Sequence, residues 1–113
     1  MRHLKKKKLG KGKDHRRKLL RSLASSALLY EKIVTSHANA RALRSYLEPL
    51  ITRSKTDNLH NRRVLLAGLS KNATKKVFEV IGPRVATRPG GYIRLTKLNK
   101  PSAGKSKVLV EIL

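Results

Sequence analysis

Lysine and arginine are the residues of this chain whose type and spacing suit one particular chemistry, the neutralisation of phosphate. Eleven of the first 21 residues are Lys or Arg, and Asp14 is the one acidic residue among them. The 113 residues together carry 28 Lys and Arg against 6 Asp and Glu, a formal net charge of +22. Like charges at this density repel one another in a compact domain. We therefore expect a polyanionic partner, of which nucleic acid is the commonest.

The densest basic segment is residues 1–13. Seven of these residues are Lys or Arg, four of the lysines are consecutive, and His3 adds an eighth basic group. A segment of this composition is unable to bury a core, so we expect an extended arm that orders only against nucleic acid. The alternative is a solvated tail that aids solubility, but solubility requires far fewer charges.

Two later segments combine cations with groups that suit RNA. His60–Arg63 places donors on one side of an expected helix. In Arg88–Arg94, glycines let the backbone approach a phosphate, arginines offer forked donors, and Tyr92 could stack on a base or ribose. The alternatives are an ordinary solvated helix face and a glycine turn that enters a strand with Tyr92 half-buried. Both alternatives stay open at this point.

The candidate RNA-binding residues are mostly cationic and come from all parts of the chain. They are Arg2, His3, Lys5, Lys6, Lys7, Lys8, Lys11, Lys13, His15, Arg16, Arg17, Arg21, Arg41, Arg44, Arg62, Arg63, Arg84, Arg88, Gly90, Gly91, Tyr92 and Arg94.

Catalytic and metal-binding patterns have little support. The six acidic residues are scattered, and no two have the spacing of a general acid–base pair on one helix face. The four histidines lack the spacing of metal ligands, and the absence of Cys excludes disulfides and thiolate metal sites. We expect no enzymatic activity, no cofactor, no metal and no small-molecule substrate. No apolar run approaches the roughly 18 residues of a membrane span, and no signal peptide is expected.

The first helix is expected from Asp14, which would act as its N-cap. Its apolar stripe consists of Leu20, Leu23, Ala24, Ala27 and Leu28. The opposite arc consists of Lys18, Arg21, Ser22 and Ser25. A short β-branched strand is expected over residues 32–35, with Ser36 as the cap of the next helix.

Three more helices and two strands are expected after that strand. The second helix has the stripe Leu43, Tyr46, Leu47, Leu50 and Ile51, with Pro49 predicting a kink or broken turn near Ser45. Asp57 would cap the third helix, which carries Leu59, Leu65, Leu66 and Leu69. The fourth would run from about Ala73 to Ile81 and end at Gly82-Pro83.

A strand around Ile93 and Leu95 and a terminal strand over residues 108–113 would form a hairpin, joined by a basic loop at 99–107. The expected fold is therefore α+β: a small two-layer domain over residues 14–113, ordered helix–strand–three helices–two strands, behind a basic arm at 1–13.

An ordered set of short motifs resembles the bacterial large-subunit ribosomal proteins of the L17 family, over about residues 1–98 and again in the final strand. The motifs are Met1-Arg2-His3, His15-Arg16, Leu20-Arg21, Ile33–Ser36, Ala40-Arg41, Leu43-Arg44, Leu50–Thr52, Leu59–Arg63, Phe78, Ile81, Pro83-Arg84 and Arg88–Arg94. The resemblance implies a structural, rRNA-binding protein on the solvent side of the large subunit, near the tunnel exit, beside other ribosomal proteins. The chain departs from the family pattern at Asn39, Ala42 and residues 99–107.

The resemblance implies as partners large-subunit ribosomal RNA and neighbouring large-subunit proteins, in a cytoplasmic ribosome. We expect no membrane and no obligate homo-oligomer. Two rivals remain on composition alone. A small architectural DNA-binding protein would also be basic, but would favour a dimer and an arm or ribbon in the minor groove. A basic amphipathic protein of anionic membranes would need wide apolar faces with interfacial aromatics, and the first expected helix has only Tyr30.

Overall fold

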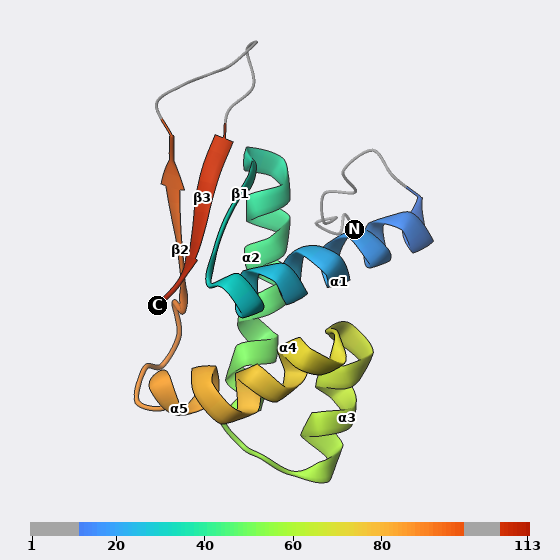
Figure 1. Ribbon diagram of the computed structural model, residues 1–113, viewed down its shortest axis with the longest axis vertical. Coiled ribbons are helices and arrows are strands. Elements are labelled where there is room, and N and C mark those ends of the chain that lie inside the picture. Colours follow the sequence, from blue (N-terminus) through green and yellow to red (C-terminus); the bar gives the residue numbers. More distant parts are fainter. Residues whose placement is uncertain (1–11, 99–106) are drawn as a thin grey trace, which may run out of the picture.

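The computed structural model describes residues 12–98 and 107–113. The candidate residues Arg2, His3, Lys5, Lys6, Lys7, Lys8 and Lys11 lie outside the described residues, as does the basic loop apart from its last residue, Lys107. The elements that follow are shown in Figure 1.

Helix α1 spans Lys13–Tyr30 and begins one residue earlier than expected. Its N-cap is Gly12, so the prediction that Asp14 caps it is wrong; Asp14 lies in the first turn, where a negative charge favours the helix dipole. Ala24, Ala27 and Leu28 are buried as the stripe predicts. Ser25, expected on the solvent arc, is also buried, because its Oγ accepts the Ser70 amide at 2.9 Å.

Strand β1 spans Lys32–Ser36 and helix α2 spans His37–Ser54. Ser36 caps α2 as predicted, since its side chain accepts the Asn39 amide at 3.2 Å. The helix is continuous through Pro49, so the alternative of a broken turn near Ser45 is wrong. Ser45 is exposed, and water can therefore satisfy the carbonyl that loses its helical donor to proline.

Helix α3 spans Leu59–Gly68 and is capped by Asn58, whose Oδ1 accepts the Asn61 amide at 2.8 Å. The prediction that Asp57 is the cap is wrong, because its carboxylate binds Arg62 instead. Leu65 and Leu69 are buried as expected. Leu59 and Leu66, the other two leucines of this helix, are exposed.

The last helical region is made of α4 (Lys71–Lys76), a π-helical turn η1 (Val77–Ile81) and α5 (Gly82–Arg84), which follow one another without a break. The prediction that Gly82-Pro83 ends the helix is wrong, because Pro83 lies in the first turn of α5, where a missing amide costs no helical bond. A Cβ on Gly82 would lie 3.1 Å from the Val77 carbonyl oxygen and 3.2 Å from that of Ser54. Glycine therefore permits the close approach of α5 to α2.

Strands β2 (Ile93–Lys97) and β3 (Lys107–Ile112) pair antiparallel, which confirms the predicted hairpin. The order of the three-stranded sheet is β1-β3-β2, so the C-terminal strand is central and also pairs antiparallel with β1. One register row joins Val34, Leu109 and Thr96 across the sheet. The pairing of β3 with β1 was not predicted.

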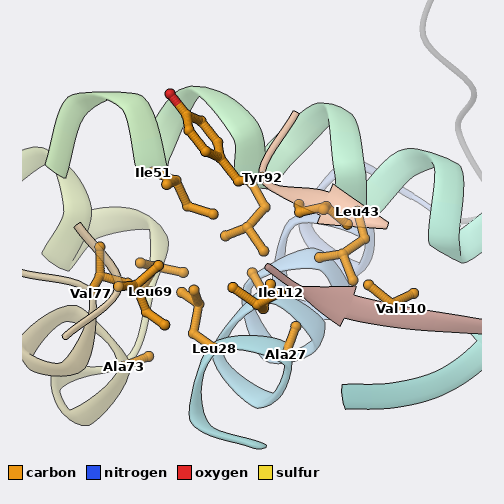
Figure 2. Packing of buried hydrophobic residues seen from close by; sticks show 14 of the residues in the cluster. Ala27, Leu28, Leu43, Ile51, Leu69, Ala73, Val77, Tyr92, Val110 and Ile112 are labelled. Carbon is orange, nitrogen blue, oxygen red and sulfur yellow. The ribbon is translucent and has the colours of Figure 1, made fainter. Parts of the chain in front are cut away.

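The helices cover one face of the sheet, as Figure 1 shows, and the core fills the space between the two layers. Val108, Val110 and Ile112 point from the central strand into this core, which confirms the predicted alternation. They meet Leu28 and Leu43 from the helices (Figure 2). The small α+β fold with the expected element order is thus confirmed.

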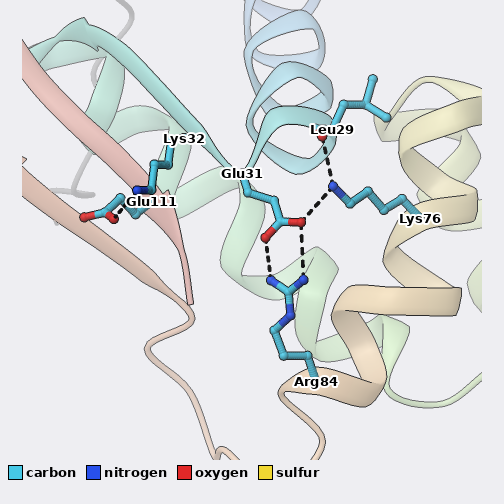
Figure 3. A network of polar contacts seen from close by, with 6 residues as sticks. All are labelled: Leu29, Glu31, Lys32, Lys76, Arg84 and Glu111. Carbon is cyan, nitrogen blue, oxygen red and sulfur yellow. Dashed lines mark hydrogen bonds and ion pairs between the residues drawn. The ribbon is translucent and has the colours of Figure 1, made fainter.

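Glu31 joins three parts of the fold just after α1 (Figure 3). It adopts a left-handed backbone conformation (φ 66°), and its carbonyl accepts the Ile112 amide at 2.9 Å. Its carboxylate binds both Arg84 Nη1 at 2.6 Å and Lys76 Nζ at 2.9 Å. The hydrogen bond from Arg84 first, and that from Lys76 second, lower the pKa of Glu31 to about 2. One residue therefore ties α1, the last helical region and the sheet together, the helical region through its side chain and the sheet through its backbone carbonyl.

Two adjacent leucines test the assigned faces of α1. Leu28→Ala should reduce the free energy of unfolding by about 2–5 kcal/mol, because Leu28 is fully buried. Leu29→Ala should change it by less than about 0.5 kcal/mol, because Leu29 is exposed. Urea unfolding followed by circular dichroism measures both, and equal losses would show that the faces are misassigned.

The depressed pKa of Glu31 predicts a dependence of stability on pH. The carboxylate contributes stability fully above its ordinary pKa of 4.5, and this contribution disappears as the pH falls towards about 2. Glu31→Gln should therefore be less stable than wild type at pH 6, and the difference should vanish near pH 2. Urea unfolding of both proteins across this range measures it; a difference independent of pH would contradict an ionic role.

Candidate nucleic-acid interface

The first turns of α1 carry cations outside the core. Buried residues of α1 begin only at Ala24, and in Figure 1 the N-terminal half of the helix projects beyond the other elements. This half holds the candidate residues Lys13, His15, Arg16 and Arg17, of which all but the half-buried Arg16 are exposed. None of them forms an ion pair within residues 12–98 and 107–113. These side chains are therefore available to a partner.

Arg21, predicted for the same surface, serves the fold instead. Its Nη2 donates to the Leu69 carbonyl at 2.8 Å and to the Leu66 carbonyl at 3.4 Å. These carbonyls lie at the C-terminal end of α3, where helical acceptors lack partners. Arg21 thus links α1 to α3, and a contact with RNA would have to compete with this bonding.

Carboxylates hold two further candidate arginines. Arg84 donates to both oxygens of Glu31, at 2.6 and 3.2 Å. Arg62 donates to both oxygens of Asp57, at 2.6 and 2.8 Å, and its guanidinium lies 4.8 Å from the centre of the Phe78 ring. These pairings raise the pKa of both arginines, with the carboxylate hydrogen bond as the main cause. Arg62 and Arg84 are therefore already bound to internal anions.

The run His60–Arg63 does not present four donors on one exposed side. Asn61 is buried, and its side chain donates to the Thr56 carbonyl at 2.8 Å and accepts from Arg53 at 3.1 Å. His60 and Arg63 are exposed. The prediction of a four-residue contact face is wrong for Asn61, because the helix turns that side chain towards the N-terminal junction of α3.

Arg41 and Arg44 are exposed on a different side of α2 from the side that faces α1. Tyr46 lies on the side of α2 that faces α1, close enough for the charges of Arg21 and Arg17 to influence its hydroxyl. Burial raises the pKa of Tyr46, and the two arginines oppose this rise. Arg44 is two residues away from Tyr46, about 200° around the helix, and shares a face with Glu48, one turn later. Glu48 contacts the start of β2. The cations of α1 and those of α2 thus form two separate surfaces.

The backbone from Gly91 to Ile93 points inward rather than at a ligand. The carboxylate of Glu48 accepts the amides of Gly91, Tyr92 and Ile93 at 3.2, 2.9 and 3.1 Å. Gly91 has φ +66°, the conformation that favours glycine, while Gly90 has open space around it. The prediction that the backbone of these glycines approaches phosphate is not supported at Gly91, because its amide is already taken by Glu48.

Tyr92 is fully buried, so the prediction that it stacks on a base is wrong. Figure 2 shows its ring within the core cluster. Its hydroxyl bonds the Thr52 hydroxyl at 3.0 Å, and the Lys55 ammonium lies 4.7 Å from the ring centre. The neighbouring candidates Arg88 and Arg94 are exposed. Of the candidates in the segment Arg88–Arg94, the two arginines and Gly90 remain available.

Three exposed lysines in helices were missing from the candidate set: Lys18 in α1, and Lys71 and Lys75 in α4. The position of Lys18 opposite the apolar stripe of the first helix could have indicated its exposure, whereas only the net charge pointed to Lys71 and Lys75. Within the described residues, no group of three His, Asp or Glu could hold a metal ion. No helix in that part of the chain is long and apolar enough to cross a membrane.

Known proteins are similar to this chain in sequence. The family model described as ribosomal protein L17 matches residues 19–112. The chain is 46% identical over 108 residues to large ribosomal subunit protein bL17 of Carboxydothermus hydrogenoformans, covering 94% of this chain and 96% of that protein. It is 43% identical over 116 residues to the bL17 of Salinibacter ruber, covering 100% of this chain and 59% of that protein. For the bL17 of Flavobacterium psychrophilum the identity is 40% over 116 residues, with coverages of 100% and 72%.

The chain thus spans nearly the whole of one relative and about three fifths of another. The family match covers α1 from residue 19 and every later element as far as β3. With the scattered acids and the surplus of cations, these similarities confirm the family expected from the sequence: the chain belongs to the ribosomal protein L17 family, whose members are structural and not enzymatic.

Proposed function

We propose that this protein is a structural component of the large ribosomal subunit that binds large-subunit ribosomal RNA by neutralising phosphates. The observation that carries the proposal is the projecting half of α1, whose cations lie outside the core and bind no carboxylate of the described residues. Family membership favours ribosomal RNA over DNA as the polyanion. The relatives are named as proteins of the large ribosomal subunit.

The position of these cations on α1 supports a polyanionic partner. Arg16 and Arg17 lie in the first turns of a helix, where the positive end of the helix dipole disfavours them. The N-cap residue Gly12 adds no side-chain hydrogen bond to the first amides. A phosphate at this end would relieve both the charge repulsion and the unsatisfied donors.

Two cationic surfaces on different sides of α2 extend the proposal to two RNA segments. One consists of the α1 residues Lys13, Arg16, Arg17 and Lys18, and the other of Arg41 and Arg44 on α2. Each surface would release counterions from its own segment, so that the protein holds the two segments together. The arm at residues 1–13 would add further phosphate contacts. Neighbouring subunit proteins would complete the site in the cytoplasmic ribosome.

Paired and unpaired cations should differ in their effect on RNA binding. The double variant Arg17→Gln/Lys18→Gln should reduce the log–log salt slope of binding to large-subunit ribosomal RNA by about 1.4–1.8, at about 0.7–0.9 for each lost phosphate contact. The double variant Arg62→Gln/Arg84→Gln, the matched control, should lower stability and leave the slope unchanged, because Asp57 and Glu31 already bind these arginines. Filter binding at several salt concentrations measures the slope. If the control variant reduced the salt slope as much as the α1 double variant does, the result would contradict the proposal.

Deletion of residues 1–11 tests the arm. This segment contains six Lys or Arg residues. If half of them contact phosphate, the salt slope should fall by about 2–3. Filter binding of the deleted and full-length proteins to the same RNA measures this, and an unchanged slope would show that the arm serves only as a solubilising tail.

A further inference from the structure

Helix α3 carries two leucines on the side that faces away from the core. The side chains of Leu59 and Leu66 are 65% and 45% exposed. They are seven residues apart, and this spacing places them on one face, two helical turns from each other. Asn61 and Leu65 occupy the opposite, buried face. Leu59 and Leu66 are therefore not part of the hydrophobic core.

Two arginines border these leucines. Arg62 pairs with the carboxylate of Asp57 and lies over the ring of Phe78, so its charge is largely neutralised within the fold. Arg63 is exposed and forms no ion pair within the described residues. We name Leu59, Leu66, Arg62 and Arg63 the leucine face. It combines two exposed leucines with one arginine, Arg63, that pairs with no carboxylate among the described residues.

We infer that the leucine face docks a neighbouring protein of the large subunit, through a segment that presents apolar side chains next to a carboxylate. The inference rests on the proposed function. Leucines gain free energy on leaving water only when an apolar surface covers them. The ribose-phosphate backbone would itself lose hydration against them. The leucines thus favour a protein over RNA, and within a protein the forked guanidinium of Arg63 is complementary to a carboxylate.

Binding to two probes separates this inference from the proposed function. The double variant Leu59→Ser/Leu66→Ser is compared with wild type and with Leu29→Ser, a matched exposed leucine on α1. The first probe is naked large-subunit ribosomal RNA. The second is large-subunit particles from which salt has removed this protein while most other proteins remain. Thermal unfolding should show that both variants fold like wild type, since the substituted side chains are exposed.

The double variant should bind naked RNA like wild type and bind the particles about tenfold or more weakly, while Leu29→Ser should match wild type on both. An equal loss on both probes, or no loss on the particles, would overturn the leucine face and leave RNA binding intact. Failure of wild type to bind naked RNA would instead overturn the proposed function.

A photoreactive residue at position 59 identifies the occupant chemically. In reassembled particles it should crosslink to a protein segment that contains both apolar and acidic residues, as read by mass spectrometry. The same residue at position 17, on α1, should crosslink to ribosomal RNA. Crosslinking of position 59 to RNA, or to residues 1–11 of the same chain, would overturn the inference.

Discussion

The shortage of carboxylates is the constraint on which this structure depends. The chain has six acidic side chains and 28 Lys and Arg, so few cations can form ion pairs within the fold. Arg21 bonds to backbone carbonyls instead. Glu31 binds Arg84 and Lys76 where three parts of the chain meet, and Asp57 binds Arg62 beside Phe78. Glu48 forms no ion pair with the cations that the structure describes and instead accepts three backbone amides at the entrance to β2. The cations left over are those that a polyanion would neutralise.

This division gives the two sets of cations different energetic roles. A paired cation such as Arg84 stabilises the folded chain, and moving it to a phosphate would break both hydrogen bonds that it donates to Glu31. An unpaired cation such as Arg17 is surrounded by like charges, and a phosphate would remove that repulsion. RNA binding by this protein would therefore gain free energy because phosphates remove the repulsion among the unpaired cations.

Much of the fold could be predicted from the sequence, because apolar periodicity and capping are local properties. The stripe of α1, the Ser36 cap and the alternation of Val108, Val110 and Ile112 are examples. The central position of β3 could not be predicted, since it depends on pairing between strands about 75 residues apart in the chain. Asp57 and Asn58 are both good caps, and only the three-dimensional position of Arg62 shows why Asn58 takes that role.

The candidate site was harder to predict, because the chemistry that suits RNA also suits the interior of the fold. The forked donors of Arg62 and Arg84 fit carboxylates as well as phosphates, and Tyr92 has a ring that packs in a core as readily as on a base. The amide of Gly91 could face a phosphate, but Glu48 occupies it. Sequence separates these roles only when the positions of the few acidic side chains are known.

Arginine reactivity towards phenylglyoxal, read residue by residue with and without large-subunit ribosomal RNA, tests the division of cations most directly. The account predicts that Arg17, Arg41 and Arg44 react readily in the free protein and become protected by RNA. Arg62 and Arg84 should react slowly in both states, because Asp57 and Glu31 already hold them. Free reactivity of Arg84 that disappears on RNA binding, with Arg17 unchanged, would contradict it.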